Sequence, residues 1–254
     1  TLRRHRGGSV AVALVALLVV FLALFDWNWV RPSLERYIAR KTEREFRMSD
    51  LHVRLGLSPT IRMRDVYFGN AAWSKDAPAM AKIEMLEFSV SLRDLPEKIL
   101  VPRVALTRPE LVFERLPDDR KNWILSDPSD TSPSKLRIST LSVDHGRLRY
   151  RDHGVPFTLE VQGSTFDPQS QQKVKDADAK PSNNRYTTQY DFKGTYHGAQ
   201  FSGQALTGDV LSFQESGVPF PLQGRLDAGT TRLAVEGVIA DAADISAIDV
   251  DLRI

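Results

Sequence analysis

The sequence predicts a mainly β protein in which a membrane helix and a short amphipathic helix precede an antiparallel sheet. Three observations support this fold class: an uncharged apolar run near the N-terminus, a short helical pattern after it, and alternation of apolar and polar residues from residue 46 to the end. Helices repeat their apolar face about every 3.6 residues and half-buried strands every two. The change of period therefore separates a helical N-terminal region from a β region.

The N-terminus reads as a membrane anchor. Residues 1–6 form a basic tail, and residues 7–25 carry no charge. A 19-residue helix spans about 28 Å, close to the hydrocarbon thickness of a bilayer. Trp27 and Trp29 follow directly and are expected to lie at the membrane interface. A cleaved secretory signal shares these features, but no small-x-small cleavage pattern closes the run, so we expect an uncleaved single-pass anchor.

Flanking charge indicates the orientation of this anchor. Arg3, Arg4 and Arg6 precede the apolar run, which favours a cytoplasmic N-terminus, and Asp26 follows it. Six basic residues between positions 31 and 47 follow on the other side, mixed with three glutamates. We expect the bulk of the chain on the far side of the membrane.

The next region, 26–45, is expected to hold one juxtamembrane helix. Pro32 suits a first helical turn, and Leu34, Tyr37 and Ile38 fall on one face. Residues 46–166 and 186–254 are expected to form two parts of a β domain that continues beyond residue 254. Residues 167–185 are polar and predict a flexible loop between the two parts.

Alternation is the evidence for strands, because every second residue of a strand points to the same face. The clearest runs are Leu51, Val53, Leu55 and Leu57; Leu86, Phe88, Val90 and Leu92; Phe157, Leu159 and Val161; and Leu233, Val235, Gly237 and Ile239. No helical stripe of comparable length follows Glu45. An ordinary sandwich core would show the same alternation, so the pattern alone leaves open whether the apolar face is filled.

Composition and motifs argue against several functions. The chain has no cysteine, which excludes disulfides, cysteine-ligated metals and a cysteine nucleophile. Without the three N-terminal arginines, 31 basic residues face 32 acidic ones, so we expect no nucleic-acid partner. His145 and His153 recur in Asp-His-Gly turns, for which a structural role outweighs metal binding. Carboxylates are plentiful but no pair stands out for a glycosidase, which leaves a hydrolase as the weakest alternative.

Several stretches in order resemble one family. They are Asp26-Trp27-Asn28, Thr42-Glu43-Arg44-Glu45-Phe46, Asn70-Ala71-Ala72-Trp73, Arg108-Pro109-Glu110-Leu111, Asn122-Trp123 and Asp244-Ile245-Ser246. In this order the chain resembles the AsmA family of Gram-negative envelope proteins. Glu43 and Asp119-Arg120 depart from the family pattern, since glycine is usual in both turns.

The resemblance implies an inner-membrane protein with a periplasmic body, a curved sheet with an apolar β-groove, and a role in phospholipid transport and outer-membrane biogenesis. It implies no catalytic residue, cofactor or metal. Trp73 and Trp123 are expected to be packing anchors, and Pro109 to mark a strand edge or start. The expected partners are membrane phospholipids, with envelope assembly proteins as further candidates. The residues expected to line the groove are Leu51, Val53, Leu55, Leu86, Phe88, Val90 and Leu92. The alternative is a non-enzymatic envelope scaffold that carries no lipid.

Overall fold

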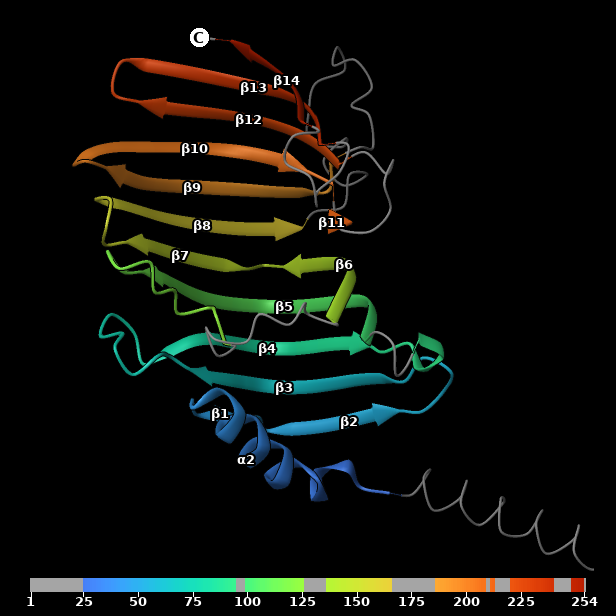
Figure 1. Cartoon of the computed structure of the whole chain (residues 1–254). Helices are drawn as coiled ribbons and strands as arrows, with labels where there is room; N and C mark the ends of the chain where they lie inside the picture. Colours follow the sequence, from blue (N-terminus) through green and yellow to red (C-terminus); the bar gives the residue numbers. More distant parts are fainter. Residues whose placement is uncertain are drawn as a thin grey trace, which may run out of the picture.

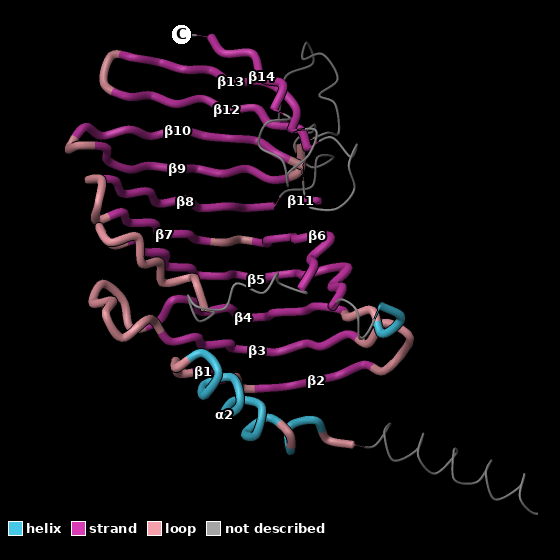
Figure 2. Tube along the Cα trace, in the orientation of Figure 1, coloured by secondary structure: helices cyan, strands magenta, loops and turns pink. Residues whose placement is uncertain are grey.

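The computed structural model describes residues 25–94, 99–125, 136–165, 186–208, 211–212, 220–239 and 248–253. It confirms a mainly β chain, with one open sheet and few helices (Figures 1 and 2). Apart from Phe25, the predicted anchor at 7–25 lies outside these ranges, as does the predicted loop at 167–185. No described helix is both long and apolar enough to span a bilayer.

The helical part comprises η1 (Trp27–Trp29) and α2 (Arg31–Thr42), followed later by η2 (Leu92–Asp94). The strands are β1 (Phe46–Arg47), β2 (Asp50–Arg54), β3 (Thr60–Gly69), β4 (Ala79–Ser89), β5 (Ile99–Arg115), β6 (Leu136–Asp144), β7 (Arg147–Asp152), β8 (Phe157–Thr165), β9 (Thr188–Tyr196), β10 (Ala199–Thr207), β11 (Leu211–Ser212), β12 (Phe220–Ala228), β13 (Thr231–Ile239) and β14 (Ile248–Arg253).

The strands stack in a nearly sequential order, β1-β3-β4-β5-β7-β8-β9-β10-β12-β13-β14. Of the other three strands, β2 pairs with β3, β6 with both β5 and β11, and β11 with β6. Most neighbours are antiparallel hairpins, as the turn pattern predicts. The sheet therefore grows in one direction from α2 (Figure 1).

The expectation of a wholly antiparallel sheet is wrong at β5. This strand runs parallel to β6 in the register Ile99↔Leu136, and parallel to β7 in the register Glu110↔Arg147. The reason is the long connection after Arg115, which allows the chain to return before the next strand starts. Alternation reports which face a side chain occupies but not the direction of a strand.

A line of left-handed residues creases the first part of the sheet. Asp65 in β3, Arg108 in β5 and His145 between β6 and β7 have φ values of 47°, 46° and 53°. They lie at matching register positions, and Glu84 of β4 completes the line and pairs with Arg108. The strand register is the same before and after them, so each backbone turns locally without an inserted residue. Pro109 lies here, buried in the middle of β5 rather than at a strand edge or start.

The hydrophobic core lies between α2 and the first strands. Phe46, Met48, Leu51, Met63, Val66, Phe68, Met80, Ala81 and Ile83 form the buried cluster. Leu34 and Ile38 of α2 pack against it, whereas Tyr37, the third residue of the predicted helical face, is 55% exposed. All buried Ala, Val, Ile, Leu, Met and Phe side chains among the described residues lie between Phe46 and Val101. The closed core therefore belongs to the start of the sheet.

Side chains from the helical segments cap the first edge of the sheet. The Leu51 amide donates to Asn28 Oδ1 at 3.0 Å, and the Met48 amide donates to Glu35 Oε1 at 2.9 Å. Arg31 donates in return to the carbonyls of Met48 and Ser49. These contacts satisfy backbone groups that would otherwise offer an edge for pairing with another chain.

Candidate functional site

Beyond β5 the sheet has two chemically different faces. On β7, Leu148 and Tyr150 point to one face while Arg147, Arg149 and Arg151 alternate with them. The same division continues on the next strands because each register pairs like with like, as in Leu148↔Val161 and Arg149↔Glu160. We call the first the apolar face and the second the charged face.

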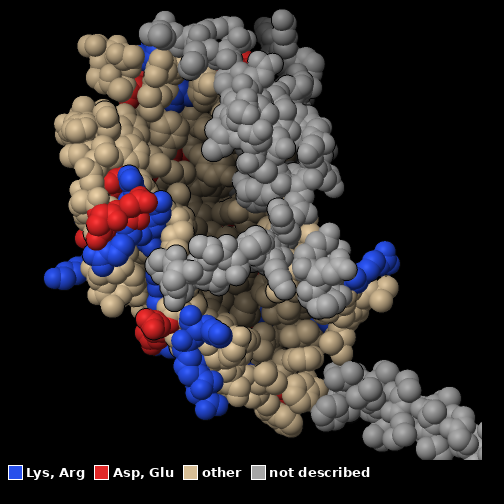
Figure 3. Space-filling view, viewed as in Figure 1, with Lys and Arg blue, Asp and Glu red and all other residues tan. Residues whose placement is uncertain are grey.

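Among the residues that the structure describes, no second layer closes the apolar face after β5. Its side chains are half-buried, whereas those of the core are buried. Figure 3 shows a hollow whose visible walls are largely uncharged, in the view that also shows α2 in front of the sheet. The half-buried apolar residues are Leu148, Tyr150, Phe157, Leu159, Val161, Tyr190, Phe192, Phe201, Leu222, Leu226, Leu233 and Val235. This face is the candidate site.

A row of aromatic rings begins the apolar face where the core ends. Phe113 contacts Trp123 at a centroid distance of 5.4 Å, and Trp123 contacts Tyr150 at 5.9 Å. Tyr150 contacts Phe157 at 5.9 Å, and Phe157 stacks on Phe201 with an interplanar angle of 11°. Trp123 is therefore the packing anchor that the sequence predicts, and it joins the core to the apolar face.

Two glycines on this face lie directly beneath aromatic rings. Because they have no side chain, the rings can lie flat against the backbone of the sheet, which we call the floor of the face. A Cβ added at Gly203 would come 2.4 Å from the Phe192 ring, and one at Gly194 would come 2.5 Å from the Phe201 ring. No side chain larger than hydrogen fits beneath either ring. The rings therefore lie directly on the sheet.

The predicted groove residues lie at the start of the sheet, in three different settings. Leu51 is only 4% exposed, inside the closed core. Val53, Leu86 and Phe88 are half-buried and pack against that core. β2 and β4 end sooner than the alternation suggests, so Leu55, Val90 and Leu92 lie outside the strands. Their contact with lipid stays a prediction.

The two interface tryptophans differ in their surroundings. Trp27 packs against the core, whereas Trp29 is 73% exposed. Both contact Phe25 edge-on, at centroid distances of 5.2 and 5.8 Å. The three rings form an aromatic cluster where the described chain begins.

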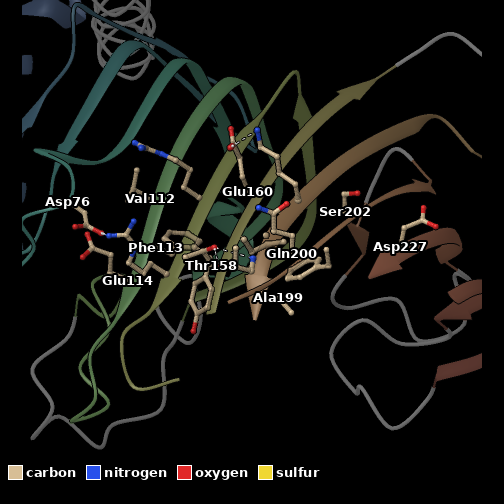
Figure 4. Close-up of a pocket in the computed structure, with 18 of the residues that line it drawn as sticks. Asp76, Val112, Phe113, Glu114, Thr158, Glu160, Ala199, Gln200, Ser202 and Asp227 are labelled. Atoms are coloured by element: carbon tan, nitrogen blue, oxygen red, sulfur yellow. Dashed lines mark hydrogen bonds and ion pairs between the residues drawn. The ribbon is translucent and has the colours of Figure 1, made fainter. Parts of the chain in front are cut away.

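The charged face carries a cleft of about 1140 Å³ over β5 and β7–β10 (Figure 4). Its charges largely pair with one another: Arg151 binds Asp76, and Lys193 Nζ lies 3.5 Å from Glu160. Next to the cleft, Asp152 accepts from the Val155 and Gly154 amides and from Arg115. These contacts lower the pKa of Asp152 to about 2. The cleft therefore presents satisfied charges rather than a reactive group.

Asp76, Glu114 and His153 come close enough to hold a metal ion, with potential ligand atoms within 4.8 Å of one another. The carboxylates already have protein partners, since Glu114 accepts from Ser74 and Asn70 and Asp76 pairs with Arg151. The two predicted Asp-His-Gly histidines have different partners, because His145 contacts Asp144 and His153 lies 3.6 Å from Glu114. This arrangement fits a structural role.

The residues that the sequence analysis proposed for the groove lie at the start of the sheet, whereas the half-buried apolar face lies after β5. The residues after β5 alternate as regularly as those before it, so periodicity gave no reason to prefer them. The usable signal was the repeated pairing of glycine with aromatic residues across strands, as in Phe192↔Gly203 and Gly194↔Phe201.

Comparisons with known proteins identify a family for this chain. The profile of the AsmA family matches residues 8–254. The Escherichia coli K12 protein named AsmA family protein YhjG is 23% identical over 271 aligned residues. That alignment covers 94% of this chain and 39% of the relative, so the chain spans about two-fifths of the relative's length.

Proposed function

Because the chain belongs to the AsmA family, whose membership suggests a function at the cell envelope, we propose that its apolar face binds the acyl chains of phospholipids. The bound lipid would travel between the inner and outer membranes and contribute to outer-membrane biogenesis. We further propose that the chain is held in the inner membrane by a single N-terminal span, with its body in the periplasm.

The observation that carries the proposal is the row of half-exposed apolar side chains after β5. Moving a sixteen-carbon chain into water costs on the order of 12 kcal/mol, at about 0.8 kcal/mol per methylene. A continuous apolar floor offsets that cost along the path. Lipid binding also lowers the free energy of the protein, because the exposed apolar surface of the floor leaves water.

The dimensions of the sheet suit this role. Eight strands of the principal order run from β5 to β14, and strands lie about 4.8 Å apart, which gives a floor on the order of 34 Å long. One leaflet of a bilayer has a hydrocarbon thickness of about 15 Å. The floor is therefore long enough to hold an entire acyl chain.

The closed core at the start of the sheet supports different roles for the two parts of the sheet. Between α2 and β4 the space beneath the strands is filled by Met63, Val66 and Phe68. We infer that this part is a rigid base and that lipid contacts begin at the aromatic row of Phe113, Trp123 and Tyr150. The rest of the route would be supplied by sequence that the longer relatives contain.

The test is a pair of substitutions on opposite faces of β12. Leu226 is half-buried on the apolar face, and Gln223 is exposed on the charged face of the same strand. Phospholipid that co-purifies with the full chain would be extracted and measured by mass spectrometry. We expect Leu226→Lys to reduce bound lipid several-fold, while Gln223→Lys and the apolar Leu226→Met retain it.

Melting temperatures of all three variants serve as the control for folding. Normal lipid capture by a folded Leu226→Lys variant would contradict the proposal. If no variant and no wild-type preparation carries lipid, the envelope scaffold that binds proteins becomes the better account.

A further inference from the structure

A small apolar tip projects from the end of the sheet at the β2–β3 turn. Leu57 is 86% exposed there, and Leu55 and Leu92 are each 49% exposed. Leu57 is the most exposed large apolar side chain that the structure describes, and Leu55 and Leu92 share fifth place with Ile124. Three exposed leucines in one place cost solvation free energy unless something covers them.

Backbone hydrogen bonds hold the segments of the tip together, so its exposed side chains form one continuous surface. The Leu92 amide donates to the Leu57 carbonyl at 3.4 Å, and the Val90 amide donates to the Pro59 carbonyl at 3.0 Å. The Ser91 amide donates to the Leu100 carbonyl at 2.8 Å, which brings the start of β5 to the same place. Ile99, the first residue of β5, adds a fourth exposed apolar side chain.

Two arginines flank these leucines. Arg54 ends β2 and Arg93 lies in η2, and both side chains are exposed. Neither forms an ion pair with another residue in the described ranges. Exposed leucines bordered by exposed cations match the chemistry of an anionic bilayer surface, where apolar groups enter the acyl boundary and cations stay among the headgroups.

The tip also lies on the side of the molecule where the described chain begins. In Figure 1 the β2–β3 turn and η2 project to the right, and the start of the described chain, with η1 next to it, lies to the lower right. The aromatic cluster of Phe25, Trp27 and Trp29 is at that start, with Trp29 exposed. Tip and cluster together would give a bilayer two separate contacts.

We propose that the tip formed by Leu55, Leu57, Leu92 and Ile99, with Arg54 and Arg93, inserts into an anionic phospholipid bilayer. This second contact fixes the angle of the sheet to the membrane, which a single flexible tether would leave free. It does not depend on lipid transport, and it applies equally to a scaffold.

The absence of cysteine from the chain gives a direct test. The full chain would carry one cysteine at Leu57, labelled with an environment-sensitive fluorophore, and would be reconstituted in vesicles of phosphatidylethanolamine and phosphatidylglycerol. The matched control is a cysteine at Val155, an exposed apolar residue in the β7–β8 turn. We expect the emission of the Leu57 label to shift to the blue and its quenching by bromolipids to exceed that at Val155 several-fold.

A second variant distinguishes insertion of the Leu57 label into the bilayer from simple proximity of the label to the membrane surface. Adding Arg54→Glu and Arg93→Glu to the Leu57 label should reduce the quenching, while the same label in phosphatidylcholine vesicles should show a smaller blue shift. Equal quenching at Leu57 and Val155, or emission at Leu57 like that in water, would overturn the proposal.

Discussion

Glu43 ends α2 in the left-handed region, with φ 53° and ψ 31°. A residue with a Cβ pays roughly 1–2 kcal/mol for this conformation, which is why glycine is common there. The sequence marks Glu43 as a departure from the family's glycine at this turn, and the structure shows that the turn is kept. In the second departing turn the left-handed residue is Asp119, with a φ of 67°, and not Arg120, which stands where the family usually has glycine.

Replacing Glu43 by glycine should therefore stabilise the protein. The side chain is exposed, so little is lost with it. We expect Glu43→Gly to raise the free energy of unfolding by about 1 kcal/mol, after the extra entropy of glycine in the unfolded chain is subtracted. Chemical denaturation would measure this. Lys41→Gly, inside the same helix, should lower stability by about 1 kcal/mol, and a loss of stability in Glu43→Gly would contradict the argument.

Two of the family-like motifs are explained by one buried polar cluster. Asn122 is fully buried, and its Oδ1 accepts from the Glu114 amide at 2.9 Å. Its Nδ2 donates to Asn70 Oδ1 and to the Val112 carbonyl. The Asn70 and Asn122 motifs, far apart in sequence, thus fix the turns at the end of β5. Sequence order could identify the motifs but could not show that they meet.

At the scale of elements, helix α2 was predictable, and the way in which the helical segments cap the sheet was not. Pro32 and the spacing of Leu34 and Ile38 predict α2, and the structure places it at Arg31–Thr42. Hydrophobic periodicity contains no information on which polar side chains reach a neighbouring strand. Periodicity therefore gave no signal for Asn28, Arg31 or Glu35, although they satisfy the edge of β1 and β2.

Removing these caps should open the first edge of the sheet. We expect Asn28→Ala combined with Glu35→Ala to lower the free energy of unfolding by about 1–3 kcal/mol, because two backbone amides lose their acceptors. Hydrogen exchange at the amides of Met48 and Leu51 should accelerate, and size-exclusion chromatography should show more self-association. Arg36→Ala, on the exposed side of α2, is the control. Unchanged exchange at both amides would show that the caps do not matter.

The direction of strands marks the limit of prediction at this scale. Alternation locates β5, β7 and β8, yet the parallel pairing of β5 with β6 and β7 depends on a connection whose course periodicity does not describe. The ends of β2 and β4 were also overestimated. Leu55 and Leu57 continue the alternation in sequence but lie in the β2–β3 turn, and Leu92 begins η2.

At the scale of the whole molecule, one alternating pattern serves two purposes. Between α2 and β4 it fills a core, and after β5 it leaves half-exposed apolar side chains over low glycine positions. The sequence could predict both stretches as strands. It could not tell them apart, because whether an apolar face is covered depends on which other segments lie against it.

The most direct test of the account compares three positions that carry a photo-crosslinking phenylalanine analogue in the full chain within membranes. Phe192 lies on the open apolar face, Phe88 packs against the closed core, and Gln204 is on the charged face. The account predicts crosslinked phospholipid at Phe192, several-fold less at Phe88, and none at Gln204. Equal crosslinking at Phe88 and Phe192, or lipid captured at Gln204, would contradict it.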